Sequence, residues 1–142
     1  MDNIDFFNRF TVALLAKLSS SFPTPIDPKI SSICEEVISS NEVSDEEWYN
    51  HRKSAEHAVQ FLIDEGFIRA STLGGFDGKI FHNVQLTMKA WSILGEPSSL
   101  ESKESIASKM KSIASDGIKS AASESIASLI SVLFAAAKTH FL

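Results

Sequence analysis

The sequence contains a single cysteine, Cys34, so no internal disulfide can form and nothing indicates an oxidising compartment. It also lacks a run of about 18 apolar residues, the length that a membrane-spanning helix needs. The opening residues, MDNIDFFNRF, carry Asp2 and Asp5 where a secretory leader carries lysine or arginine. These absences favour a cytoplasmic protein and argue against a membrane partner.

Motifs for catalysis and metal binding are missing as well. The histidines His51, His57, His82 and His140 do not have the spacing of metal ligands, and no cysteine or carboxylate stands at ligand spacing beside them. The segment GGFDGK lacks the spacing of a phosphate-binding loop and has no serine or threonine after Lys79, so it is interpreted as a hairpin turn. There is no nucleophile elbow. We therefore expect no enzymatic activity, no metal and no cofactor.

Positive charge is scarce. The 142 residues include 13 Lys and Arg against 18 Asp and Glu, a net charge of −5. Residues 1–95 hold eight of these cations and thirteen of the acids. Most DNA-binding domains have a basic surface, because each phosphate contact needs a nearby cation. Any DNA binding must therefore rely on a local basic patch and on more than one copy of the domain.

The most informative segment that is present is FLIDEGFIRASTLGGFDGKIFHNVQLTMKAWSIL, residues 61–94. A helical apolar pattern runs into Gly66, and glycine is the commonest residue just past a helix end. Two β-rich stretches follow, separated by a turn between Gly74 and Gly78, which is the pattern of a hairpin with a longer loop. Thr87 can then cap a short helix over residues 88–94.

Upstream of this segment the pattern is helical. Apolar residues recur at threes and fours over residues 5–22, and the prolines of FPTPIDP end that helix. Between these prolines, Ile26 is expected to form a one-residue strand that pairs with the hairpin. Asp27 before Pro28 predicts the cap of a second helix reaching to about residue 40. Ser44 and Glu47 form a capping box for a third helix that ends at residue 65 or 66.

The stretch FLIDEGFIR, a glycine hairpin and VQLTMKAWSIL resemble bacterial winged helix-turn-helix domains, including small prophage-associated ones of uncharacterised function. The resemblance covers about the first two thirds of the chain. It implies a mainly α fold with a small β-hairpin (α+β), with a winged-helix domain over residues 1–95. It also implies a cytoplasmic DNA-binding transcription regulator. The expected core members are Trp48, Val59, Leu62, Phe67, Ile80 and Leu86.

In such a domain the third helix reads DNA, so the side chains opposite its apolar face are the candidate contacts. They offer donors and acceptors suited to base edges and phosphates, with Arg52 at the edge of the apolar face and two cations from the wing. Acidic residues on the same helix, Glu46, Glu47 and Asp64, oppose this interpretation, and a polar helix face is also typical of simple solvation. The candidates are Asn50, Arg52, Lys53, Ser54, His57, Gln60, Arg69 and Lys79.

Residues 96–142 form a separate region, with a linker at Pro97 and two amphipathic helices, or one helix loosened at Gly117. Their apolar stripe has no partner that the sequence can assign, so we predict a homo-oligomerisation arm. Folding back onto the same chain is the alternative, and an in-plane membrane helix is disfavoured by its serine-rich polar face. The interface candidates are Ile126, Leu129, Ile130, Leu133, Phe134, Ala137 and Phe141.

The sequence therefore leaves two functions open. The first is a DNA-binding regulator that acts as an oligomer on double-stranded DNA. The second is a winged helix that binds another protein and no nucleic acid, which its acidic composition and apolar tail favour. Cys34 lies in a series of apolar residues at helical spacing, so we interpret it as a packed thiol.

Overall fold

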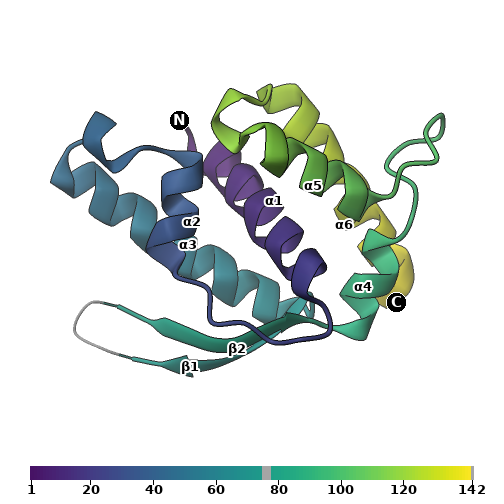
Figure 1. The fold of residues 1–142 in the computed structure, drawn as a ribbon, viewed down its shortest axis with the longest axis horizontal. Coiled ribbons are helices and arrows are strands. Elements are labelled where there is room, and N and C mark those ends of the chain that lie inside the picture. Colours follow the sequence, from purple (N-terminus) through teal and green to yellow (C-terminus); the bar gives the residue numbers. More distant parts are fainter. Residues whose placement is uncertain (75–77, 142) are drawn as a thin grey trace.

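The computed structural model describes residues 1–74 and 78–141, with the side chains of residues 140 and 141 left out. It is mostly helical with one small antiparallel hairpin, which confirms the predicted mainly α fold class. The elements run in the order expected from the sequence (Figure 1). They are α1 (Asn3–Ser21), α2 (Ile30–Val37), the 3₁₀ turn η1 (Ser40–Glu42), α3 (Asp45–Asp64), β1 (Ile68–Leu73), β2 (Ile80–Leu86), α4 (Met88–Leu94), α5 (Ile106–Asp116), η2 (Ile118–Ser120) and α6 (Ser123–Phe141).

The hairpin is extended by one residue from the segment between α1 and α2. Strands β1 and β2 pair antiparallel, with Ile68 opposite Leu86 at one end and Leu73 opposite Ile80 at the other. Ile26 then bridges to Val84 on the free edge of β2, with N–O distances of 2.9 and 2.7 Å. The predicted one-residue strand is therefore confirmed. The expected turn falls on residues 74–78, of which 75–77 lie outside the described residues.

Local caps explain where the helices of this region begin and end. The hydroxyl of Ser44 accepts a hydrogen bond from the backbone N–H of Glu47 at the start of α3, and Thr87 does the same for Ala90 at the start of α4, both at 3.1 Å. Gly66 follows α3 with a φ of +81°, a conformation that glycine adopts without strain. All three predicted helix boundaries are confirmed.

The predicted cap of the second helix is wrong. Helix α2 begins at Ile30, its N-cap is Lys29, and no side chain caps it. The carboxylate of Asp27 instead accepts a hydrogen bond at 2.8 Å from the backbone N–H of Asn83. Because Ile26 is held against β2, its neighbour Asp27 is drawn to the strand rather than to the helix.

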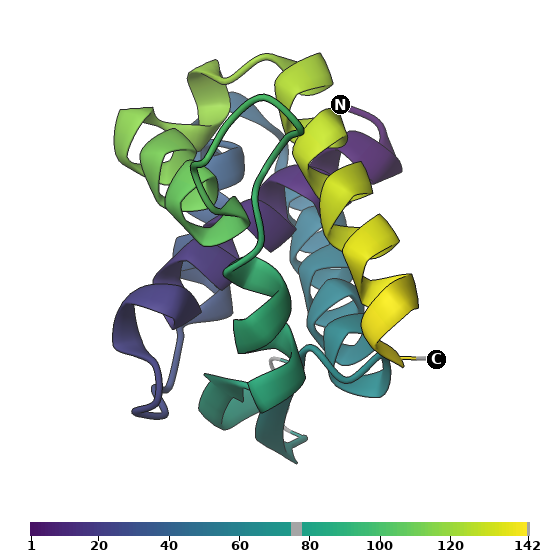
Figure 2. The same cartoon turned by 90° about the vertical axis from the view of Figure 1, so that its right-hand side faces the viewer.

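Helix α1 lies at the centre of the molecule and contacts both halves of the chain (Figures 1 and 2). Most of the predicted core is confirmed, since Val59, Leu62, Phe67 and Leu86 are buried, and Trp48 is partly buried against them. The prediction that Ile80 belongs to the core is wrong, because 53% of this residue is exposed. The pairing register shifts between Arg69 and Ser71, which changes which side chains of the hairpin point inward and which point outward. Phe81 therefore takes the buried position instead of Ile80.

The premise that the apolar stripe of residues 106–141 has no partner in its own chain is wrong. The stripe packs on α1 and α4 and joins the same core as the first 95 residues. Among the interface candidates, Phe134 is partly buried and meets Phe67 edge to face at 5.8 Å between ring centres, while the side chain of Phe141 lies outside the described residues. The other candidates are buried in this core: Ile126, Leu129, Ile130, Leu133 and Ala137. The fold-back arrangement is thus the one observed, with two helices separated at Gly117.

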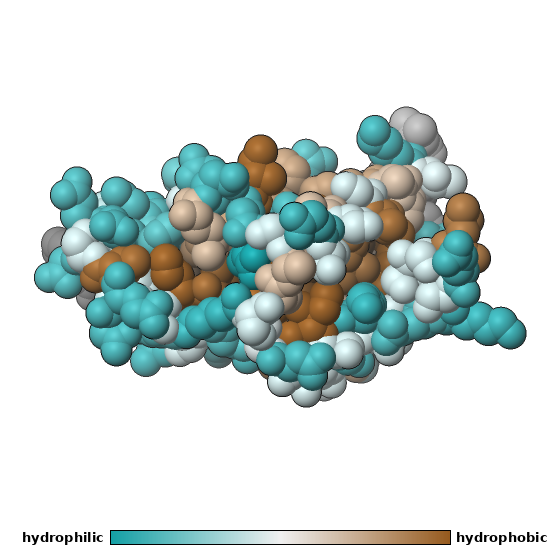
Figure 3. Space-filling model, turned by 90° about the horizontal axis from the view of Figure 1, so that it is seen from above, coloured by the Kyte–Doolittle hydropathy of each residue, from teal (hydrophilic) through white to brown (hydrophobic). Residues whose placement is uncertain are grey.

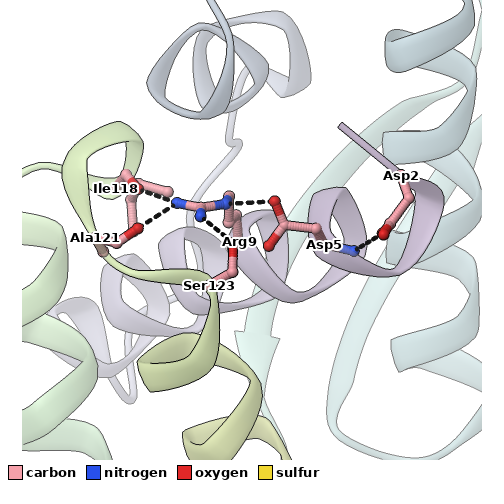
Figure 4. A network of polar contacts seen from close by, with 6 residues as sticks. All are labelled: Asp2, Asp5, Arg9, Ile118, Ala121 and Ser123. Carbon is pink, nitrogen blue, oxygen red and sulfur yellow. Dashed lines mark hydrogen bonds and ion pairs between the residues drawn. The ribbon is translucent and has the colours of Figure 1, made fainter.

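A buried arginine joins α1 to the turn between α5 and α6 (Figure 4). The guanidinium of Arg9 on α1 donates hydrogen bonds to the carbonyls of Ile118 at 2.7 Å and Ala121 at 3.0 Å, and to the hydroxyl of Ser123 at 2.9 Å. Its Nε also pairs with Asp5 at 2.9 Å. Arg9 is only 6% exposed, so its charge is committed to holding the turn between α5 and α6 against α1.

Candidate nucleic-acid interface

The outward side of α3 carries most of the predicted polar face. Asn50 and His57 are exposed, while Lys53, Ser54 and Gln60 are partly exposed. The side-chain amide of Gln60 donates to the carboxylate of Asp64 at 2.9 Å. The predicted candidates on this helix therefore do share one accessible surface.

Lys53 is held at the middle of this surface by two neighbours on its own helix. Its ammonium lies 3.7 Å from a carboxylate oxygen of Glu56 and 5.5 Å from the ring centre of Tyr49, in cation–π geometry. About 40% of the Lys53 side chain remains exposed. The lysine can thus reach an incoming phosphate, although Glu56 offsets part of its charge.

A groove of about 550 Å³ separates the start of α2 from the hairpin. Arg52 reaches it from α3, Lys29 from the start of α2, and Lys79 and His82 from the hairpin. Among the described residues that line it, Asp27 alone carries a carboxylate, which accepts a hydrogen bond from the Asn83 amide and lies 3.9 Å from His82 Nδ1. The described lining therefore has an excess of cationic side chains in an acidic protein.

Arg69 lies apart from this group. It is exposed on β1 opposite Gln85, whereas Lys79 lies just before β2 at the other end of the hairpin. The two cations assigned to the wing are therefore separated along the length of the hairpin. They could contact a long ligand such as a duplex together, but not one small anion.

Sequence reasoning missed Glu56, Lys29 and Tyr49. Glu56 stands three residues after Lys53 and four after Arg52, so helical spacing alone places it beside both. Lys29 was counted only among the eight cations of residues 1–95, because nothing local in the sequence places the start of the second helix beside the hairpin. Tyr49 could have been found from its position four residues before Lys53.

The cations of the first 95 residues are unevenly distributed. Arg9 is buried, Lys17 lies 3.9 Å from Glu36 on the α2 side of α1, and Lys89 is on α4. The other five surround the start of α2, helix α3 and the hairpin, namely Lys29, Arg52, Lys53, Arg69 and Lys79. Exposed acids at the first turn of α3, Asp45, Glu46 and Glu47, lie at one end of this surface.

Other chemistry has little support in the part of the chain that the structure describes. No group of three His, Cys, Asp or Glu side chains in the described ranges is placed to hold a metal ion. Cys34 is fully buried, and burial raises the pKa of its thiol to about 12, as expected for a packed residue. None of the described helices combines the length and the apolar character needed to cross a bilayer.

No family model matches the chain, and comparisons with curated proteins and with solved structures found no similar protein. The geometry of this surface is therefore the basis for a functional proposal.

Proposed function

We propose that the chain is a cytoplasmic winged-helix protein that binds double-stranded DNA and regulates transcription. The outward face of α3 would enter the major groove, with the hairpin and the start of α2 on the phosphate backbone. The observation that carries this proposal is the grouping of Lys29, Arg52, Lys53 and Lys79 along α3 and the neighbouring groove, in a region of net negative charge.

The polar and charged groups have separate roles in this proposal. Asn50 and Gln60 have side chains that can pair with adenine edges, and His57 can donate or accept at a base. Arg52, Lys53 and Lys79 supply charge for phosphates, which gives affinity but no sequence information. Loss of a charged contact should therefore weaken binding to all sequences, and loss of Asn50 should change the preference at one position.

A gel-shift assay with fragmented genomic DNA at about 50 mM salt tests the proposal. We expect retarded complexes for the full chain, weaker ones for Lys53→Ala and Arg52→Ala, and an altered set of bound fragments for Asn50→Ala. Lys17→Ala removes one positive charge from α1, outside the proposed surface, and serves as the matched control. Equal binding by all these variants would remove this face from consideration.

A second function is favoured by the apolar surface on the other half of the molecule. Seen from above, apolar residues gather more densely over the half that holds α5 and α6 than over the half that holds α2 and α3 (Figure 3). Leu100 is fully exposed beside a groove of about 670 Å³ that Pro97, Val132 and Ala136 also line. Exposed apolar patches of this kind are typical of protein-binding surfaces. A protein-interaction module is therefore the alternative, and absence of DNA binding at low salt would favour it.

Self-association stays a prediction. Its original argument, an apolar stripe without a partner, no longer applies, because the stripe is buried within one chain. An acidic domain would still gain DNA affinity from two linked copies, since the second contact becomes effectively intramolecular. Any interface between copies must then use surfaces other than the buried side chains of α6.

A further inference from the structure

Glu56 is a buried acid on the helix proposed to read DNA. Only 8% of it is exposed, and a buried charge is costly unless it has partners. Its Oε1 accepts a hydrogen bond at 2.9 Å from the backbone N–H of Lys79, directly before β2. Its Oε2 lies 3.7 Å from the ammonium of Lys53 on its own helix. One carboxylate thus contacts both α3 and the hairpin.

The hairpin approaches this carboxylate closely. Gly78 has a φ of +111°, and a Cβ atom at this position would lie 2.8 Å from Oε2 of Glu56. A side chain at this position would strain the backbone and would push the carboxylate aside, so glycine suits the close approach. At the other end of the hairpin, the N–H of Phe67 donates to the carbonyl of Leu62 at 2.9 Å. Both ends of the hairpin are therefore attached to α3.

We propose that Glu56 is a positioning residue that fixes the start of β2 against α3 and so sets the separation between Lys53 and Lys79. This inference rests on the proposed DNA-binding function, because that separation matters when both lysines contact the phosphates of one duplex. Glu56 itself does not touch DNA. Glu56 holds Lys53 through the lysine ammonium and Lys79 through the lysine backbone N–H.

The sign of the effect separates positioning from simple electrostatics. Glu56 is an anion near a surface that binds a polyanion, so removing its charge alone would strengthen DNA binding. Loss of positioning would weaken binding, because the hairpin cation would no longer be held at a fixed distance from α3. Positioning and simple electrostatics therefore predict opposite changes in DNA affinity when Glu56 is replaced.

Glu56→Ala, Glu56→Gln and Glu46→Ala test this in the full chain. Alanine removes the acceptor for the Lys79 amide, whereas glutamine keeps a carbonyl oxygen in its place. Glu46 is an exposed acid in the first turn of the same helix, so its removal controls for the change in charge. Two quantities are measured: the hydrogen-exchange rate of the Lys79 amide and the affinity for a DNA duplex at about 50 mM salt.

We expect Glu56→Ala to speed exchange of the Lys79 amide about tenfold or more and to weaken DNA binding about threefold or more. Glu56→Gln should keep the slow exchange and bind DNA as well as the natural chain or better, because it loses only the charge, and Glu46→Ala should bind DNA as well as the natural chain or better. Unchanged Lys79 exchange in Glu56→Ala, or DNA binding that equals or exceeds that of the natural chain, would overturn the proposal.

A second variant covers the case in which Glu56→Ala does not fold. Glu56→Asp keeps the charge and shortens the side chain by one methylene, which withdraws the carboxylate from the Lys79 amide, so it should show the same faster exchange and weaker binding. If the natural chain binds no DNA, the proposed function fails. In that case, faster exchange of the Lys79 amide in Glu56→Ala would still show that Glu56 attaches the hairpin to α3. The proposed role of Glu56 in DNA binding would be refuted.

Discussion

Replacing Arg9 with methionine should destabilise the whole protein by about 3 kcal/mol. Methionine fills a similar volume but removes the donors to Ile118, Ala121 and Ser123, which leaves acceptors in the turn between α5 and α6 without their partner. Breaking a buried charged contact costs about 3–5 kcal/mol, and the lower end applies here because Asp5 is 22% exposed and regains water. For a domain of this size the melting temperature should fall by about 9 °C.

Thermal and urea unfolding of Arg9→Met measure this loss of stability, and Lys17→Met on the same helix is the control. Lys17 is half exposed and 3.9 Å from Glu36, so its loss should change stability by no more than about 0.5 kcal/mol. Hydrogen exchange should also speed up in α5 and α6 of Arg9→Met. If both variants were equally stable, the attachment of the C-terminal helices through Arg9 would be refuted.

Other predictions follow from the shared core and from Cys34. Leu133→Ala should lower the free energy of unfolding by about 2–5 kcal/mol in urea titrations, because Leu133 is fully buried. Leu133→Asp should unfold the chain rather than yield a folded monomer, as circular dichroism and light scattering would show. A chain truncated after residue 94 should fail to show cooperative unfolding, because α1 loses the cover of α5 and α6. Cys34 should resist thiol reagents at pH 8 in the native state and react in denaturant. Its pKa rises from 9.0 to about 12 on folding, so this contribution to stability is complete below about pH 9 and is lost progressively as the pH rises to 12.

Local chemistry made the elements of the first 95 residues predictable. Ser44 and Thr87 specify their helix starts through hydrogen bonds within three residues, and Gly66 specifies a stop through its own φ. Such features depend on neighbours in sequence. Asp27 was misassigned because its partner, the amide of Asn83, is 56 residues away.

The packing of the C-terminal helices could not be predicted for the same reason. An amphipathic stripe shows that a surface is buried but not by which partner, and the residues that bury it lie on α4 and on α1, near the other end of the sequence. Arg9 was counted as one more cation, although its guanidinium donates to the carbonyl of Ile118. The candidate site was predicted more fully, since most of its residues lie on a single helix whose exposed face follows from its period.

The most direct test of the central claim is the salt dependence of DNA binding by the full chain, measured by fluorescence anisotropy on a labelled duplex. If Arg52, Lys53 and Lys79 contact phosphates, the logarithm of the binding constant should fall with the logarithm of salt concentration with a slope of about −3. The slope should become less steep by about one unit in Lys53→Ala and stay unchanged in Lys17→Ala. No binding at the lowest salt, or the same slope in both variants, would contradict the assignment of this surface to DNA.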